Sequence, residues 1–180
     1  MYEKLIGKLE EAEKGPFYTK EEFEKIFEEY KRKHRIRIYI DMDDTLCQFT
    51  KSKNEHLERN PDNKYPWCQL DFFRNLEEVQ SGVETIKLLA KEGYDVWILT
   101  RPSIRNPLSY MEKRIWVEEH LGFDWCDKLI LCPNKSLLIG DILIDDKIWE
   151  NFKGIQLHFG SESCSDWETA YKQIHEYEKI

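Results

Sequence analysis

The stretch Ile36-Arg37-Ile38-Tyr39-Ile40-Asp41-Met42-Asp43-Asp44-Thr45 decides the fold of this chain. Apolar and other residues alternate from 36 to 40, which predicts a β-strand, and the carboxylates that follow predict a loop at its end. Because strand side chains repeat every second residue, Asp41 and Asp43 are expected on one side, as like charges with no internal neutralising partner. Such a pair favours a divalent metal, Mg²⁺ in particular. The alternative is an acidic turn, since Asp is a common turn residue.

The overall composition is that of one soluble globular domain. The chain has 180 residues, 41% hydrophobic and 34% charged, which allows one core and a small insertion but not two full domains. No stretch approaches the roughly 20 apolar residues of a membrane span. The first residues, 1–4, lack the basic and then apolar layout of a signal peptide. We therefore expect a cytoplasmic protein with no membrane partner.

Cysteine usage and net charge exclude several classes of protein. The five cysteines are odd in number and form no Cys-x-x-Cys pair. This argues against a disulfide framework and a zinc site, and it predicts free thiols in a reducing compartment. The formal net charge of −8 disfavours charge-driven binding to a nucleic acid polymer. A local basic site for a small anion is compatible with this charge.

Residues 1–34 are expected to form a charged, helical N-terminal extension. Thr19 and Glu22 make a capping box, and four apolar residues follow at the spacing of one helix face. This face is expected to cover the core of the domain. The alternative is an interaction helix, for example one that forms a homodimer. The four residues are Phe23, Ile26, Phe27 and Tyr30.

Residues 47–82 differ in character and are interpreted as a small insertion over the carboxylates. The segment is rich in polar and turn residues through Asn60 to Asn63 and then aromatic, without strong helical periodicity. Its rings either stack on a planar ligand or form a core of their own, and the residues alone leave both alternatives open. The rings in question include Tyr65, Trp67, Phe72 and Phe73.

From Gly82 onward, helix and strand patterns alternate. Helices are expected from Val83 to Gly93, from Asn106 to Leu121, and after a capping box formed by Ser165 and Glu168. Short apolar runs predict the strands, which alternate with these helices. That order implies right-handed crossovers and a mostly parallel sheet covered on both faces, which binds ligands beyond its carboxyl ends. The strand runs are 94–100, 128–132, 142–145 and 155–159.

Polar residues follow several of these strands and should converge on the first two carboxylates. Thr100 ends one strand, Lys135 stands in a later loop, and Asp145 and Asp146 end the next strand. Alone, each is more typical of an ordinary strand end, surface lysine or turn. Together they describe a phosphate site, in which metal-binding carboxylates, one hydroxyl and one cation surround three phosphoryl oxygens.

These residues resemble the four motifs of a known superfamily. Asp41-x-Asp43-x-Thr45, then Thr100, then Lys135, then Gly140-Asp141-x-x-x-Asp145-Asp146 is similar to the haloacid dehalogenase-like (HAD-like) phosphohydrolases. Within them the chain most resembles the 5'(3')-deoxyribonucleotidases of the cytosolic and mitochondrial type and their bacterial and phage relatives. The resemblance covers about residues 35–159. It implies a HAD-like, Rossmann-like α/β domain at 35–180 that carries the insertion at 47–82.

The resemblance implies hydrolysis of phosphate monoesters through an aspartyl-phosphate. Asp41 would be the nucleophile, and Asp43 would protonate the leaving group and then activate water. Thr100 and Lys135 would hold the phosphoryl oxygens. Mg²⁺ would be bound by Asp41, by the backbone carbonyl of Asp43 and by the pair Asp145 and Asp146, with Asp146 preferred as the direct ligand.

The resemblance also implies a nucleoside monophosphate as substrate, with its base received by the aromatic insertion. Phe49 and Trp67 match the residues that contact the base, whereas Phe72 and Phe73 are assigned to the core. Arg101 replaces the small residue expected after Thr100 and is interpreted as a substrate-binding residue. The insertion is shorter than in the animal enzymes, so base and sugar preference stay open.

Three other functions are weighed against this one. A phosphoacceptor receiver domain uses similar residues, but its phosphorylated Asp ends a later strand than its acidic pair, unlike the order here. A HAD-like phosphatase for sugar phosphates or another small metabolite would use the same catalytic residues. A catalytically idle nucleotide-binding module is disfavoured, because an unneutralised carboxylate cluster without metal chemistry would only cost stability.

Overall fold

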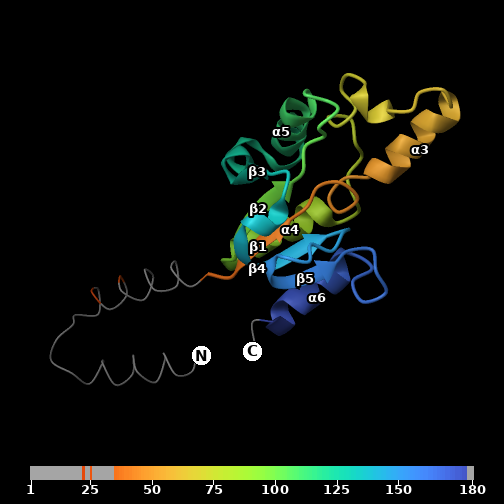
Figure 1. The fold of residues 1–180 in the computed structure, drawn as a ribbon. Helices are drawn as coiled ribbons and strands as arrows, with labels where there is room; N and C mark the ends of the chain where they lie inside the picture. Colours follow the sequence, from red (N-terminus) through yellow and green to blue (C-terminus); the bar gives the residue numbers. More distant parts are fainter. Residues whose placement is uncertain (1–21, 23–24, 26–34, 178–180) are drawn as a thin grey trace. The chain divides into compact units, whose positions relative to one another are not determined.

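The computed structural model describes residues 22, 25 and 35–177, and the elements in this part form an α/β domain (Figure 1). The predicted N-terminal helix and its apolar face lie outside the described residues, apart from Glu22 and Lys25, which are helical. The strands are β1 (Arg37–Ile40), β2 (Asp95–Thr100), β3 (Leu129–Leu131), β4 (Ile139–Asp145) and β5 (Lys153–His158). The α-helices are α3 (Phe49–Arg59), α4 (Gly82–Glu92), α5 (Ser109–Leu121) and α6 (Trp167–Tyr177), and the 3₁₀ turns are η1 (Pro66–Cys68), η2 (Phe123–Lys128) and η3 (Lys135–Leu137).

The five strands form one parallel sheet in the order β3-β2-β1-β4-β5. The predicted strands are confirmed, with small shifts of their ends. The chain leaves β1 toward β2 and β3 on one side and returns to β4 and β5 on the other. The strand order therefore reverses between β1 and β4, and this crevice is where open α/β sheets bind ligands.

The alternation along β1 divides the core into two layers. Ile38 and Ile40 belong to the larger cluster, with the buried faces of α4, α5 and α6. Tyr39 points to the opposite face and packs with Leu99 and Leu143. Within the described residues no α-helix contributes to this second cluster. Side chains from the segments that connect the strands cover it instead. The prediction of a covered sheet is confirmed, but the helical layer covers one face only, because the chain between β3 and β5 is too short for a long helix.

The segment 47–82 contains a helix that its sequence pattern does not predict. Helix α3 has no buried residue and lies apart from the sheet (Figure 1), so no apolar periodicity marks it. The carboxylate of Asp44 accepts hydrogen bonds from the backbone N–H and hydroxyl of Thr50, at 2.7 and 2.6 Å. Asp44 therefore satisfies a donor at the start of this helix. The two ends of the segment meet where Val79 N–H donates to the carbonyl of Leu46.

Two helix starts differ from the prediction. Asp166, and not Ser165, accepts the backbone N–H of Thr169 at the start of α6. Asn106 lies in the turn that precedes helix α5. Its side-chain oxygen accepts the backbone N–H of Leu108, and the helix begins at Ser109. In both cases the side chain of an Asp or Asn accepts a nearby backbone N–H group at the start of the helix.

The sequence analysis also made predictions about the cysteines and about membrane-spanning helices. All five cysteines lie in the described part of the chain and are free thiols, as predicted. Among residues 22, 25 and 35–177, no helix combines the length and apolar character that crossing a bilayer requires.

Candidate active site

Acidic segments meet at the carboxyl ends of β1 and β4. Asp41 follows β1, and its backbone N–H donates to the carbonyl of Ile144, 2.9 Å away. Asp145 is the last residue of β4, and Asp146 follows it. The two segments therefore meet in the crevice where the strand order reverses.

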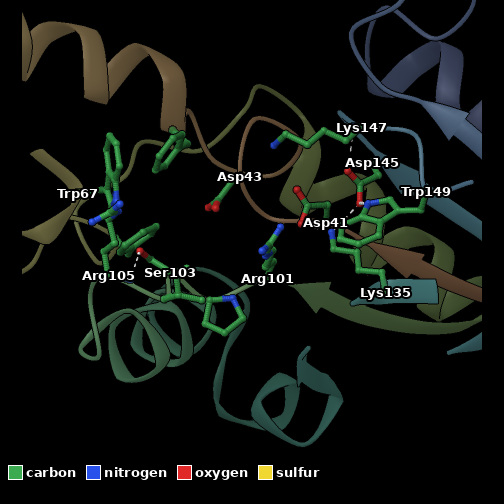
Figure 2. A pocket seen from close by; sticks show the side chains of 14 residues that line it. Asp41, Asp43, Trp67, Arg101, Ser103, Arg105, Lys135, Asp145, Lys147 and Trp149 are labelled. Atoms are coloured by element: carbon green, nitrogen blue, oxygen red, sulfur yellow. Dashed lines mark hydrogen bonds and ion pairs between the residues drawn. The ribbon is translucent and has the colours of Figure 1, made fainter. Parts of the chain in front are cut away.

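A cavity of about 330 Å³ opens over these strand ends (Figure 2). Its walls are formed by side chains from the loops after β1 and β2, from η3, from the end of β4 and the loop after it, and from the insertion. Thr100 and Asp146 are the two predicted site residues that do not line it. The others do: Asp41, Asp43, Phe49, Trp67, Arg101, Lys135 and Asp145.

Three carboxylates gather at one end of the cavity. One oxygen from each of Asp41, Asp145 and Asp146 lies within 4.8 Å of the other two. Carboxylate oxygens in such a group are the ligands that Mg²⁺ takes, and Asp41 and Asp145 are buried, where unpaired negative charge is costly. These residues therefore fit a divalent cation. The carboxylate of Asp43 is not part of this group.

Lys135 lies between two of these carboxylates. Only 1% of its surface is exposed, and its ammonium group forms ion pairs with Asp41 and with Oδ2 of Asp145, the latter at 2.6 Å. The sequence prediction that Lys135 joins the site is thus consistent with its position. Trp149, which the sequence analysis did not single out, donates its indole N–H to the same oxygen of Asp145 at 2.9 Å.

Asp43 is held by a residue that the sequence analysis did not assign to the site. The ammonium group of Lys113 lies 2.7 Å from Oδ1 of Asp43 and 2.8 Å from the hydroxyl oxygen of Thr100. Thr100 is fully buried, and its hydroxyl accepts this hydrogen bond behind the cavity wall. The expectation that Asp41 and Asp43 have no internal neutralising partner is therefore wrong, because Lys135 and Lys113 each pair with one of them.

A signal for Lys113 is present in the sequence. The buried face of α5 consists of Ser109, Glu112, Lys113, Trp116, Val117 and Leu121. This is the spacing of one helix stripe, and two of its members are charged. Charged residues are almost never fully buried unless they are paired. The position of Glu112 and Lys113 on an apolar stripe therefore indicates that each pairs with another polar group in the folded chain.

Burial and mutual repulsion raise the pKa values of three carboxyl groups at this site, those of Asp43, Asp145 and Asp146. For Asp43, burial is the largest cause, and it outweighs the opposing effect of Lys113. Burial, followed by the charge of Asp41, raises the pKa of Asp145. For Asp146, burial raises the pKa to about 6, with the charge of Asp41 adding to the effect and Lys147 opposing it. A divalent cation among these groups would favour their ionised forms.

Aromatic side chains form the other end of the cavity. The rings of Phe49 and Phe73 are stacked with centroids 5.9 Å apart, and Trp67 lies 6.2 Å from Phe49. Phe72 and Phe73 are buried, as predicted, but they join the main core of the domain, and Phe73 also lines the cavity. The rings thus provide an apolar wall at which a planar group could stack.

Comparisons with known proteins identify the family of this chain. The family model described as "5' nucleotidase, deoxy (Pyrimidine), cytosolic type C protein" matches residues 63–178. A protein of Vibrio phage KVP40, provisionally named a 5'(3')-deoxyribonucleotidase, is 31% identical over 141 residues, which cover 72% of this chain and 79% of the phage protein. The chain belongs to the 5'(3')-deoxyribonucleotidase family. The resemblance inferred from the sequence is thereby confirmed.

Two further members of the deoxyribonucleotidase family show how far the similarity extends. The 5'(3')-deoxyribonucleotidase of Bacillus subtilis is 30% identical over 120 residues, which cover 66% of this chain and 68% of the relative. The mitochondrial 5'(3')-deoxyribonucleotidase of Mus musculus is 37% identical over 82 residues, 45% of this chain and 37% of the relative. The family model match begins after Asp41 and Asp43, both of which line the cavity.

Glu112 connects the insertion of this deoxyribonucleotidase-family chain to α5. Its side chain is fully buried and accepts the backbone N–H groups of Asp71 and Phe73, at 2.9 and 3.0 Å. Lys113, the next residue on the same turn of α5, donates a hydrogen bond to the carboxylate of Asp43. One turn of α5 therefore positions both the aromatic wall and a carboxylate of the site.

Proposed function

We propose that this chain is a Mg²⁺-dependent phosphomonoesterase that removes the phosphate of (deoxy)nucleoside monophosphates through an aspartyl-phosphate intermediate. The observation that carries the proposal is the pairing of Asp41 with a second, separately held carboxylate, Asp43, in one cavity. Membership of the deoxyribonucleotidase family supports a nucleotide as substrate. Membership of this family also argues against a signalling receiver domain.

In the first step, an Asp41 oxygen attacks the phosphorus and the bond from phosphorus to the ester oxygen breaks. The leaving alkoxide takes a proton from Asp43, whose raised pKa suits it to carry one. In the second step, Asp43 removes a proton from water, the water oxygen attacks the phosphorus, and the bond to Asp41 breaks. The products are inorganic phosphate and the nucleoside, and both carboxyl groups return to their initial states.

Other residues hold the reacting groups. Lys135 stands beside Asp41 and would offset the charge of the phosphoryl oxygens, while Lys113 fixes the carboxylate of Asp43. Thr100 accepts a hydrogen bond from Lys113, and it would donate its own hydroxyl hydrogen to a phosphoryl oxygen. A Mg²⁺ ion, when bound, would screen the negative charges of nucleophile and substrate from each other.

Asp146 is the preferred direct carboxylate ligand of the second acidic pair. The carboxylate of Asp145 already accepts hydrogen bonds from Lys135, from Trp149 and from the backbone N–H of Lys147. Asp146 has one ionic partner, the more exposed ammonium group of Lys147 at 3.2 Å. Its oxygens are therefore the less committed of the two for a metal ion. Asp41 and the backbone carbonyl of Asp43 would complete the protein ligands.

The aromatic wall would receive the base. Trp67 lies at the end of the cavity away from Asp41 and Asp145 (Figure 2), and Phe49 also lines the cavity, with its ring centre 6.2 Å from that of Trp67. Stacking of a base on an aromatic ring contributes about 1–3 kcal/mol and depends little on the identity of the base. A reducing compartment such as the cytoplasm suits the free thiols of this chain.

The test is phosphate release from a panel of nucleoside 5'- and 3'-monophosphates and sugar phosphates, with and without Mg²⁺. We expect hydrolysis of the nucleotides that requires Mg²⁺ and disappears in Asp41→Asn. Equal rates in Asp41→Asn and wild type, or activity unaffected by chelation, would refute the mechanism. Equal activity across the panel would instead favour a phosphatase for small metabolites, and no activity on any member would favour a nucleotide-binding module.

A further inference from the structure

The loop between β2 and α5 places two arginines on the cavity wall. Arg101 and Arg105 are exposed and line the cavity, where Arg101 lies toward the carboxylates and Arg105 lies beside Trp67 (Figure 2). In the described part of the chain, neither guanidinium group forms an ion pair with a carboxylate.

The carboxylates of the site do not require these arginines. Each carboxylate already has a lysine: Lys135 pairs with Asp41 and Asp145, Lys113 pairs with Asp43, and Lys147 pairs with Asp146. A metal ion at the acidic group would add further positive charge there. The two guanidinium groups therefore remain free to bind an anion that the substrate brings.

Arg105 is held in an orientation that keeps its donors available. Its guanidinium carbon lies over the Tyr65 ring, 4.4 Å from the ring centre, in a cation–π contact. A cation–π contact engages the charge of the guanidinium group and not its N–H donors, which can therefore still bind a phosphate with two parallel hydrogen bonds.

The backbone of this loop is fixed by buried polar groups. The side chain of Asn106 donates to the carbonyl of Trp67 at 2.8 Å, and the hydroxyl of Ser109 accepts the N–H of Ser103 at 2.9 Å. Asn106 and Ser109 are 2% and 0% exposed. The loop is therefore tied both to the insertion and to α5, which lowers the cost of ordering it when a ligand binds.

We propose that Arg105, at the aromatic end of the cavity, binds a second phosphate group, with Arg101 between it and the acidic end (Figure 2), so that the substrate class includes deoxynucleoside 3',5'-bisphosphates. The inference rests on the proposed function: the phosphate to be removed lies at Asp41, and the second one lies along the arginine wall. Water cleaves one phosphate ester and leaves a nucleoside monophosphate and inorganic phosphate. A monophosphate, whose single anion lies at the acidic end, would leave both guanidinium groups facing uncharged parts of the substrate.

The test compares kcat/KM for thymidine 3',5'-bisphosphate with kcat/KM for the thymidine 5'- and 3'-monophosphates. We expect wild type to prefer the bisphosphate by about 10-fold or more, as charge-assisted hydrogen bonds to a phosphate would provide. Arg105→Gln should remove most of this preference, and Arg105→Lys should restore part of it. Arg59→Gln, at an exposed arginine of α3, is the matched control and should leave the ratio unchanged.

A binding measurement separates this subsite from effects on turnover. In the Asp41→Asn background, calorimetry should show tighter binding of the bisphosphate than of the monophosphate, and Arg105→Gln should reduce the difference about 10-fold. Equal kcat/KM values for all three nucleotides, or a preference that Arg105→Gln and Arg101→Gln leave intact, would overturn the subsite. A 5'-phosphorylated thymidine dinucleotide cleaved better than the bisphosphate would overturn the assignment to a mononucleotide. Failure to hydrolyse any monophosphate would refute the proposed function itself.

Discussion

The ammonium group of Lys113 lies 2.7 Å from Oδ1 of Asp43, and Lys113 is fully buried. The same ammonium group donates to Thr100, so one lysine connects the helix after β2 with the carboxylate that follows β1. A buried charge that loses its partner either destabilises the protein or becomes neutral. The proton affinity of Asp43 therefore depends on Lys113.

Lys113→Met should lower kcat about 10- to 100-fold, within the range that general acid–base catalysis contributes. Without the lysine, the pKa of Asp43 rises further, and the limb of the pH–rate profile that reports its ionisation moves to higher pH. A pH series of kcat measures both effects. Lys87→Met, at a surface lysine of α4, is the control and should keep the wild-type profile. A loss of activity with an unshifted profile would show that Lys113 acts only through stability.

Protonation of Asp146 should make the stability of the metal-free protein depend on pH. Its pKa is about 6 in the folded chain and about 3.9 for an ordinary Asp, so the folded state binds more protons between these values. The contribution of this carboxyl to the free energy of unfolding is full below about pH 4 and is lost as the pH rises through about 6.

Urea unfolding with a chelator at pH 4.5 to 7.5 measures this dependence. Asp146→Asn removes the titrating group, so wild type should lose stability relative to Asp146→Asn as the pH rises, until the difference levels off above about pH 6. Saturating Mg²⁺ should restore wild type at neutral pH and help Asp146→Asn less. A difference between the two proteins that is constant across this pH range would contradict the assignment.

Glu112→Gln should destabilise the domain by about 1–3 kcal/mol, the cost of leaving a buried donor unsatisfied. The amide has one acceptor oxygen, so either Asp71 N–H or Phe73 N–H loses its partner. Urea unfolding gives the change in free energy. Glu118→Gln on the same helix loses only a partly exposed pair with Arg114 and should change stability by less than about 0.5 kcal/mol. Similar effects of the two substitutions would argue against an anchoring role.

Trp67→Ala should raise KM for nucleotides about 10-fold and change kcat less. The ring lines the cavity at the end away from the carboxylates, so its loss removes stacking on the base, worth about 1–3 kcal/mol, without touching the reacting atoms. Trp67→Phe keeps a ring and should recover most of the affinity. Steady-state kinetics on one nucleotide and one sugar phosphate are sufficient, and an equal rise of KM for both would rule out base stacking.

The sequence by itself determined the parallel sheet and the acidic centre of this protein. Hydrophobic alternation at 36–40 and the short apolar runs after it are local signals, and parallel strands in this order bring their ends to one edge of a sheet. The sequence pattern alone therefore predicts that Asp41, Asp43, Lys135 and Asp145 lie close together. The family followed from the order and spacing of the same residues.

Only the tertiary structure decided how the charges are paired. Lys113 and Glu112 lie on the core stripe of α5, but a helix pattern does not say which carboxylate or backbone group a buried charge meets across the sheet. Helix α3 buries no residue, so it has no apolar periodicity to reveal it. The availability of Arg101 and Arg105 likewise depends on which cations the carboxylates have already taken. Local sequence patterns indicate which side chains are buried and on which face of a helix or strand they lie. The partners of buried charges are long-range contacts, which exist only in the folded chain.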